Sequence, residues 1–470
     1  MSQSVLTYAN IYISPYQFEK ITQLSLIKQV NDHIKLTLNG IVPEEKLDQY
    51  VERADENERI EVFVQDGSWK RILFQGIVTK LSVHAARDVR SITIEAYSAT
   101  FQMDVAKKTR SFQNKHLAYR DVFASITGEY TGGDVVDEAS GGKQIGGLRV
   151  QYKETDWEFA KRLASHFHAP LVPVCTQKGL RYFVGIPDLG EPQKLEEYNY
   201  TIKKNLMEYR LKSENDKQGI SEQNTISYEV TSNKILDLCS PVTFQRRTLY
   251  VYRAETRIEH GILVNHYVLR DQKGLGCFTL FPTELAGSSL FGKILDVSKD
   301  TVKVHLSIDE KQPVGEAIWF PYSTVYSSPD GSGWYCMPEI GDEVRLYFPD
   351  AKEENAIAAS SVNLESSDPK KRSDPSVKSI STKYGKQIIF QPGAIEIIGN
   401  GKLLMRLTDE GGIEINSDKK IILTAKEDIE ITGGDKVVIH GEAGVDMKQA
   451  DATLSIIDDV TLSGAKVHIK

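Results

Sequence analysis

The sequence predicts a mainly β protein with some α-helix, whose last part is a β-helix that closes only when three chains combine. Three observations lead to this fold class. Segments that alternate apolar and polar residues recur along the chain, as half-buried strands do. One capped helix pattern interrupts them near Thr155, and an eight-residue repeat begins at Gly385.

Length and composition fit several packed cores. The 470 residues correspond to about three domains. A net charge of −8 argues against non-specific binding of nucleic acid. The four cysteines form no C-x-x-C pair, which argues against a zinc or redox motif. We expect synthesis in the cytoplasm without a signal peptide, because the N-terminus lacks a basic stretch followed by an apolar core.

Strands are predicted first at residues 72–84 and 90–103, where apolar and polar residues alternate. A glycine-rich surface loop follows at 132–147. Strands resume at 241–258 and 261–270. A mixed α/β segment therefore separates two β-rich regions.

A helix is predicted to begin after Thr155, which has the T-x-x-E spacing of a capping box with Glu158. Ala169-Pro170 should end it, because the residue before proline avoids the α region. Its apolar stripe recurs every four residues and comprises Phe159, Leu163 and Phe167.

Two histidines, His166 and His168, make a catalytic or metal-binding helix the alternative. Residues two apart face different sides of a helix, so they do not grip one metal as an i, i+4 pair does. The pattern favours a structural helix.

A further β-rich stretch spans residues 290–363 and opens with two alternating strands around the turn Ser298-Lys299-Asp300. The next segment is polar, contains two prolines and has few apolar residues, which is typical of a linker.

From Gly385 the sequence repeats every eight residues. Each repeat predicts a short strand followed by a turn, with two apolar positions two residues apart on one strand face. The turn positions are Gly385, Gly393, Gly401, Asp409, Ser417, Ala425, Gly433 and Gly441. The predicted core positions are Ile413, Ile415, Ile421, Leu423, Ile429, Ile431, Val437, Ile439, Val445 and Met447.

An eight-residue repeat supplies only one wall of a β-helix, since a single-chain coil needs roughly 18 residues to enclose a core. Three chains with one wall each would close a prism and leave no exposed sheet edge. The repeat therefore predicts an intertwined homotrimer. A single-chain solenoid with three repeats per coil is the alternative.

Two motifs resemble the VgrG and phage late-control-D hub proteins. The stretch Gln151-Tyr152-Lys153-Glu154-Thr155-Asp156-Trp157 with Arg162-Leu163 is similar to their Q-Y-x-E-[ST]-D-[WF]…R-L segment. Pro338-Glu339-Ile340-Gly341-Asp342-Glu343-Val344, followed by Tyr347-Phe348-Pro349, resembles the P-R-V-G-x-E-V…F segment of their OB-fold. The stretch 357–363 would then be the closing strand of that OB-fold, and the repeat resembles their spike.

The resemblance implies four parts. Residues 1–285 would form the hub, with two barrel-like β domains and a mixed α/β insertion around 105–200. Residues 286–363 would be the OB-fold, 364–382 the linker, and 383–470 a triple-stranded β-helix, or β-prism, spike.

The implied role is mechanical: a hub and spike at the baseplate tip of a contractile injection apparatus, joining the sixfold tail tube to a threefold spike that pierces the target cell envelope. The implied partners are two further copies of the chain, a tail-tube or tube-initiator protein, baseplate wedge proteins and a PAAR-type tip protein. The chain would assemble into a phage tail or a tail-like bacteriocin particle, released from the cell.

No catalytic residue, cofactor or metal site is predicted, because no G-x-S-x-G or H-E-x-x-H motif occurs. Three copies of His468 on a threefold axis are the weak candidate for a tip metal, against an ordinary surface histidine. The alternatives are a muralytic hub enzyme and a trimeric receptor-binding tailspike. The absence of aromatic residues after Phe390 counts against the tailspike.

Overall fold

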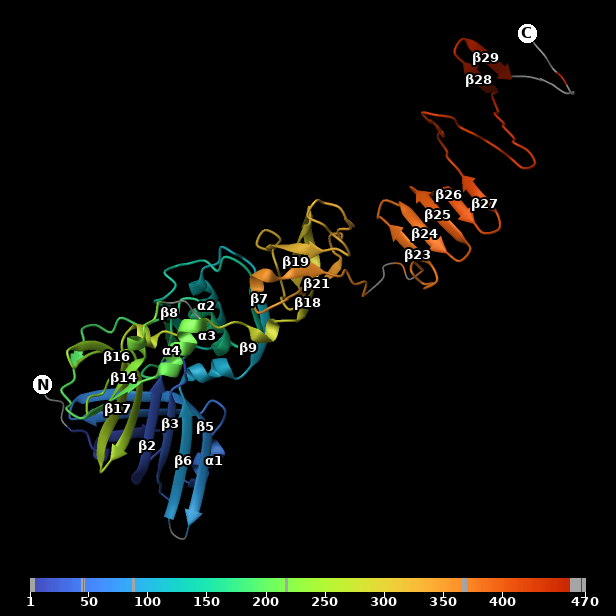
Figure 1. Cartoon of the computed structure of the whole chain (residues 1–470). Coiled ribbons are helices and arrows are strands. Elements are labelled where there is room, and N and C mark those ends of the chain that lie inside the picture. The colour runs from blue at the N-terminus through green and yellow to red at the C-terminus, as the bar shows by residue number, and fades with distance from the viewer. Residues whose placement is uncertain are drawn as a thin grey trace. The chain divides into compact units, whose positions relative to one another are not determined.

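The computed structural model describes residues 5–43, 45, 47–86, 89–215, 219–364, 368, 370–456 and 466. The chain divides into two compact units, Met1–Leu364 and Glu365–Lys470. Strands dominate both units (Figure 1). Among the described residues, no helix combines the length and the apolar character needed to cross a membrane.

The first unit is built on a twelve-stranded sheet that draws its strands from both ends of the segment 11–270. Its early strands are β1 (Ile11–Ser14), β2 (Lys20–Gln29), β3 (Lys35–Ile41), β4 (Arg59–Asp66), β5 (Trp69–Ala86) and β6 (Val89–Tyr97). Its late strands are β12 (Gln193–Lys194), β13 (Tyr200–Lys204), β14 (Ile226–Ser232), β15 (Pro241–Phe244), β16 (Arg247–Glu259) and β17 (Ile262–Arg270).

The two groups of strands meet where β2 pairs antiparallel with β16, for example at Leu26 and Thr256. The main order is β1-β4-β5-β6-β3-β2-β16-β17-β14-β13, with β15 paired to β16 and β12 paired to β15. Each group has its own hydrophobic core, one around Leu36 and Leu38 and one around Val251. Residues 11–270 therefore form two lobes that share one continuous sheet.

One predicted strand is shorter than the pattern indicated. Residues 90–103 alternate in sequence, but β6 ends at Tyr97 and Ala99–Asp104 form a 3-10 helix. Ala99, Thr100 and Met103 are all buried, and this spacing suits a helical turn rather than a strand.

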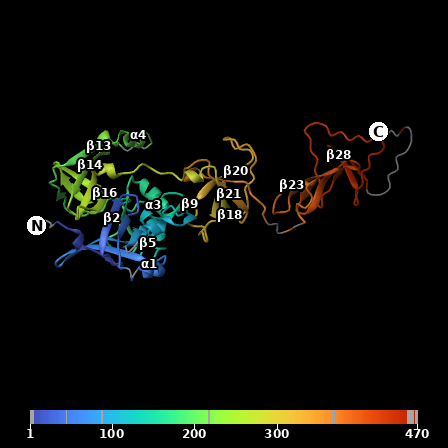
Figure 2. The same ribbon diagram turned by 90° about the horizontal axis from the view of Figure 1, so that it is seen from below.

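The insertion between the lobes contains two helices and five strands among the described residues. These elements are β7 (Lys107–Phe112), α2 (Tyr119–Thr127), β8 (Asp134–Asp137), β9 (Arg149–Thr155), α3 (Asp156–Ser165), β10 (Leu171–Val174) and β11 (Arg181–Val184). The helix α3 follows β9 directly and lies beside it in both views (Figure 1, Figure 2). Two further helices of the unit are α1 (Leu47–Arg53) and α4 (Leu206–Asn215).

A closed five-stranded barrel completes the first unit, in the order β18-β19-β20-β22-β21 with β20 parallel to β22. The predicted hairpin around Lys299 is confirmed, and Lys299 itself has a positive φ of 52°. The strands are β18 (Ser289–Ser298), β19 (Thr301–Leu306), β20 (Trp319–Ser323), β21 (Glu343–Tyr347) and β22 (Ile357–Ala359).

The second unit is an antiparallel five-stranded sheet followed by a separate hairpin. Gly385, Gly393 and Gly401 have φ between 75° and 77°, so they occupy the left-handed turns that the repeat predicts. Its strands are β23 (Lys378–Ser381), β24 (Gln387–Gln391), β25 (Ala394–Gly399), β26 (Lys402–Thr408), β27 (Gly412–Ile415), β28 (Val445–Gln449) and β29 (Ala452–Ile456).

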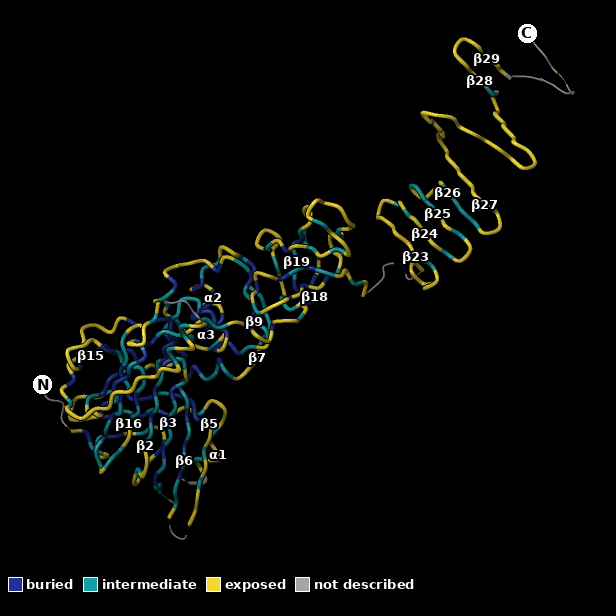
Figure 3. The backbone as a smooth tube through the Cα atoms, in the orientation of Figure 1, coloured by how far each residue is buried: buried dark blue, intermediate teal, exposed yellow. Residues whose placement is uncertain are grey.

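The first of these strands begins at Lys378, inside the segment 364–382 that the sequence indicates as a linker. Between Asn416 and Gly444 the chain forms no hydrogen-bonded strand, although the repeat continues there. Figure 3 shows that most residues of this unit are exposed, whereas the first unit contains many buried residues.

Candidate functional site

The first motif, residues 151–157, forms the end of β9 and the start of α3. The predicted capping box is confirmed: the Glu158 backbone N–H donates to Thr155 Oγ1 over 3.1 Å, and the Thr155 N–H donates to Glu158 Oε2 over 2.8 Å. The helix ends at Ser165, earlier than Ala169-Pro170 suggested. His168 has a positive φ of 55°, so the chain has already left the helix before the proline acts.

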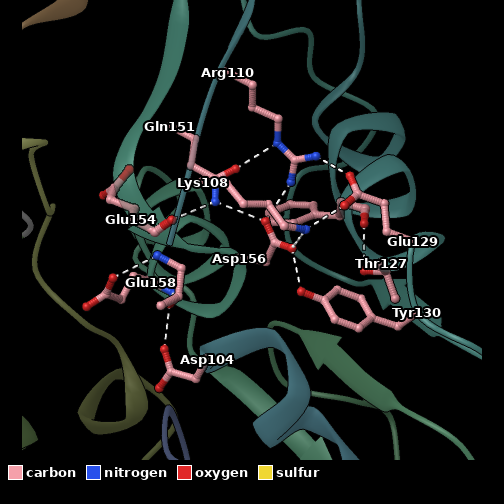
Figure 4. Close-up of polar contacts among 12 residues, drawn as sticks. Asp104, Lys108, Arg110, Thr127, Glu129, Tyr130, Gln151, Glu154, Asp156 and Glu158 are labelled. Atoms are coloured by element: carbon pink, nitrogen blue, oxygen red, sulfur yellow. Dashed lines mark hydrogen bonds and ion pairs between the residues drawn. The ribbon is translucent and has the colours of Figure 1, made fainter. Parts of the chain in front are cut away.

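Asp156 is the centre of a buried polar cluster at this helix start (Figure 4). Its Oδ1 accepts from Arg110 Nη2 at 2.6 Å and from Gln151 Nε2 at 2.9 Å. Its Oδ2 accepts from Lys108 Nζ and from the Tyr130 hydroxyl, each at 2.6 Å. Both oxygens therefore have two donors, which fills the acceptor positions of a carboxylate.

The electrostatics of this cluster keep Asp156 ionised. Burial by itself would raise the pKa of Asp156, but hydrogen bonds from Lys108, Tyr130 and Gln151 outweigh it and lower that pKa. Glu129 ion-pairs with both Lys108 and Arg110 at the edge of the cluster (Figure 4). With its acceptor positions filled and its charge balanced, Asp156 has the surroundings of a structural carboxylate.

Arg162 of α3 ties the insertion to the barrel. The fully buried guanidinium donates from Nε and Nη2 to the two oxygens of Glu154, each over 2.8 Å. Its Nη1 donates to Glu353 Oε1 over 3.0 Å, and the Val150 N–H donates to the same oxygen over 2.9 Å. Glu353 follows β21, so one carboxylate of the barrel is held by both the helix and the strand of the motif.

A second connection joins β7 to the barrel. The Ser111 N–H donates to Asp309 Oδ1 over 2.7 Å, and the Ser111 hydroxyl donates to Asp309 Oδ2 over 2.5 Å. Leu148 and Val150 belong to the hydrophobic core of the barrel. The motif segment thus fixes the barrel to the insertion through apolar packing and buried polar bonds.

A hydroxyl–imidazole–carboxylate chain also occurs, with the connectivity of a hydrolase relay. His33 Nδ1 lies 2.9 Å from Thr100 Oγ1, and His33 Nε2 lies 3.2 Å from Asp104 Oδ2. Thr100 is fully buried, and the ring of Trp157 lies against His33 with centroids 4.7 Å apart. Because a nucleophile must reach its substrate, this arrangement suits packing rather than catalysis.

The two histidines of the motif have separate partners. His166 Nδ1 lies 2.8 Å from the Tyr119 hydroxyl, and His168 Nδ1 lies 3.2 Å from the Cys277 carbonyl. In the described part of the chain, no group of three or more His, Cys, Asp or Glu side chains has metal-binding geometry. His468 lies outside the described residues.

The predicted spike residues lie on the surface of the second unit in the single chain. Their exposed fractions run from 47% at Met447 to 72% at Leu423, and Val445 is half-buried. β26 and β27 bring Met405 opposite Ile415 and Leu407 opposite Ile413, which aligns neighbouring repeats. The exposed core candidates are Ile413, Ile415, Ile421, Leu423, Ile429, Ile431, Val437, Ile439 and Met447.

Sequence reasoning did not find Glu353 or Tyr130 as partners of the motif, or Asp309 as the partner of Ser111. They lie 26 to 203 residues from the groups they contact, and an isolated acid or tyrosine carries no local pattern. The charges of Glu154 and Arg162 were visible in the sequence, but no local pattern indicates Glu353 as a partner of Arg162.

No family model matches the sequence, and no curated protein matches it. Solved structures do resemble the chain. The E. coli c3393 protein, a type VI secretion component described as similar to the T4 tail proteins gp27 and gp5, aligns with a TM-score of 0.55 at 12% identity, covering 75% of this chain and 99% of that one. A chain of the Francisella PdpA–VgrG complex aligns with a TM-score of 0.55 at 10% identity, covering 86% of this chain and 87% of that one.

These alignments show that the chain has the fold of a VgrG-type, gp27/gp5-like hub, which confirms the resemblance predicted from the motifs at the level of fold.

Proposed function

We propose that this protein is the central hub and spike at the baseplate tip of a contractile injection apparatus. The fold supports this role, because the order of a two-lobed hub, a small closed barrel and a repetitive β unit matches the order of parts that the role requires. In this proposal the barrel is the OB-fold and the second unit is the spike.

The observation that carries the proposal is the exposure of the repeat's apolar side chains in the second unit. Ile429, Ile431 and Ile439 are each more than half exposed in the single chain. Large apolar side chains that are exposed in such number mark an interface. Three chains that each supply one wall would bury these columns in a common core, and the stretch 416–444 would gain the strand partners that a single chain lacks.

The two lobes of each chain would allow a threefold assembly to match a sixfold tail tube. Each chain has two β lobes joined through β2 and β16, so three chains would present six similar lobes to a sixfold tail tube. The barrel, held by Arg162 and Glu353, would carry the three chains from the ring of lobes to the spike. A tail-tube or tube-initiator protein and wedge proteins would contact the hub, and a PAAR-type protein would contact the tip.

The proposed action has no catalytic step: sheath contraction drives the tube and the spike into the target envelope. A stiff rod suffices for this, and the buried Thr100 beside His33 is not placed to attack a substrate. The protein would act within a phage tail or a tail-like particle. A zymogram tests this point: clearing of peptidoglycan by the purified chain, lost when one acid is changed, would instead favour the muralytic alternative.

Light scattering on two forms of the protein tests the assembly. The full chain should be a homotrimer at micromolar concentration, and a chain ending at residue 364 should dissociate more readily because it lacks the second unit. A stable monomer of the full chain would contradict the proposal. Independently, electron microscopy of the particle with which the protein co-purifies would show whether the protein lies at the baseplate tip.

A further inference from the structure

A cleft of about 400 Å³ lies between the insertion and the barrel, beside the Tyr119–His166 pair and Glu353. It is bounded by α2, by the loop before β9, by the residues that follow α3, by the segment 280–282 and by the 3-10 turn after β21. The side chains that matter for its chemistry are Tyr119, Lys143, Arg149, His166, Phe281 and Lys352.

A chain of hydrogen bonds fixes the tautomer of His166 in this cleft. Arg149 donates from Nε and Nη2 to the Tyr119 oxygen over 3.4 and 3.3 Å. Because those bonds occupy the acceptor side of the oxygen, the Tyr119 O–H is left to donate to His166 Nδ1, which lies 2.8 Å away. The ring proton then sits on Nε2, the nitrogen that remains for a ligand.

The charge around His166 is positive. Burial, with help from Arg149, Arg162 and Lys143, lowers the pKa of His166 to about 3, so the ring is neutral at pH 7 and donates from Nε2. Lys143 and Lys352 are exposed at the cleft and add two ammonium groups.

Two carboxylates also line the cleft: Glu353 is buried and paired, and Glu354 is exposed. The Glu353 carboxylate already accepts from the Val150 N–H and from the Arg162 guanidinium, so the charge of Arg162 largely neutralises it. Glu354 is exposed at the rim and opposes anion binding. Its removal is therefore a useful control.

The remaining wall is apolar. Phe281 is 48% exposed, and Ile145 and Phe167 also line the cleft. An apolar wall beside several hydrogen-bond donors fits a ligand with an apolar body and one anionic end.

We propose that this cleft binds a carboxylate carried on an aromatic or aliphatic group. The carboxylate would lie near Lys143, Lys352 and His166 Nε2, and the apolar group would lie against Phe281. A small aromatic acid and the C-terminal residue of a partner polypeptide share this chemistry. The inference does not depend on the proposed hub function or on trimer formation.

Fluorine NMR on the full chain tests the proposal with 4-fluorophenylacetate as the probe and 4-fluorophenylacetamide as its uncharged match. The acid should bind in the millimolar range, and the amide should bind at least about tenfold more weakly because charge-assisted hydrogen bonds are lost. Failure of the acid to bind, or equal binding of acid and amide, would overturn the proposal.

Variants locate the binding. The Lys143→Gln, Lys352→Gln double variant changes two exposed side chains, so it should fold normally and bind the acid about tenfold more weakly. Glu354→Gln, at the same rim, should bind the acid more tightly. If the lysine variant kept full affinity, the acid would be bound elsewhere and the proposal would be wrong.

A second probe separates the two sources of the ligand. N-acetylglycyl-4-fluorophenylalanine offers the same acid at a peptide C-terminus. Tighter binding of the peptide than of 4-fluorophenylacetate would assign the cleft to a polypeptide terminus. Exclusion of the peptide with retention of the small acid would assign it to a free organic acid.

Discussion

Strands of the two units carry similar apolar patterns, yet they have opposite environments. In β3, Leu36 and Leu38 lie two residues apart and are fully buried within their own lobe. In β27, Ile413 and Ile415 are also two residues apart, but they are 67% and 57% exposed. The first unit completes its cores within one chain, whereas the second unit displays its core candidates to solvent.

The difference shows that period alone does not decide burial. Each apolar side chain stabilises a fold by about 1.5–3 kcal/mol when it leaves water completely. The two lobes gain this free energy because their apolar side chains pack into hydrophobic cores within the chain. In the proposed trimer, the one-wall repeat would gain this free energy by packing against the other chains.

A charge at one predicted core position of the second unit tests this difference most directly. Ile431→Asp would place three carboxylates around one axis if three chains close a prism. An unpaired buried charge costs several kcal/mol, and the like charges repel each other in addition. We therefore expect Ile431→Asp to lose the trimer, as judged by thermal melting and by electrophoretic retention of the trimer.

Glu430→Ser is the matched control, since Glu430 should face solvent between two core positions. It should change the free energy of unfolding by less than about 0.5 kcal/mol and assemble normally. Equal behaviour of the Ile431 and Glu430 variants would mean that Ile431 lies outside any core, and the prism would have to be abandoned.

Local patterns were predicted well and distant pairings were not. The capping box at Thr155, the hairpin around Lys299 and the glycine turns of the repeat depend on residues close in sequence, so they are visible in it. The pairing of β2 with β16 joins strands more than 200 residues apart, and alternation does not encode which strands pair. Arg162 and Glu353 are 191 residues apart, and their contact follows from the fold.

The connection between insertion and barrel offers the contrasting test inside the first unit. Arg162→Met would remove the buried guanidinium that Glu154 and Glu353 share, and would leave both carboxylates without that partner. Breaking such a pair costs about 3–5 kcal/mol, so the hub should melt at a markedly lower temperature. Because the change lies in the first unit, the C-terminal unit should still form the proposed trimer.

The control is Arg120→Met, which removes an exposed arginine paired with Asp121 at 3.5 Å. An exposed pair of this kind contributes between 0 and about 1 kcal/mol. If both arginine variants lowered the melting temperature equally, the contact between Arg162 and Glu353 would not stabilise the hub.

Acid should weaken the first unit through His166. Its folded pKa of about 3 lies below the ordinary value of 6.5, so the unfolded chain binds a proton that the folded chain excludes. The stability from neutral His166 is present above pH 6.5 and is lost as pH falls toward 3. At about 1.4 kcal/mol per pKa unit, we expect a loss of roughly 2–3 kcal/mol between pH 6.5 and 4.

His166→Gln isolates this contribution, because the amide oxygen of Gln accepts from the Tyr119 hydroxyl without titrating. Denaturant unfolding at several pH values should give a flatter pH dependence for the variant than for the parent chain. Parallel pH profiles would show that His166 takes up its proton as readily in the folded state as in the unfolded state.

The smallest expected effect is at the helix cap. Thr155→Ala removes the acceptor for the Glu158 N–H and the hydroxyl that donates to Asp104. Loss of an N-cap costs about 1–2 kcal/mol. Thr155→Ser keeps both bonds and should recover most of the loss. Because the cap is satisfied entirely within one chain, neither variant should alter trimer retention, whereas Ile431→Asp should abolish it. A capping variant that dissociated the trimer as readily as Ile431→Asp would show that the two units do not differ in how they complete their cores.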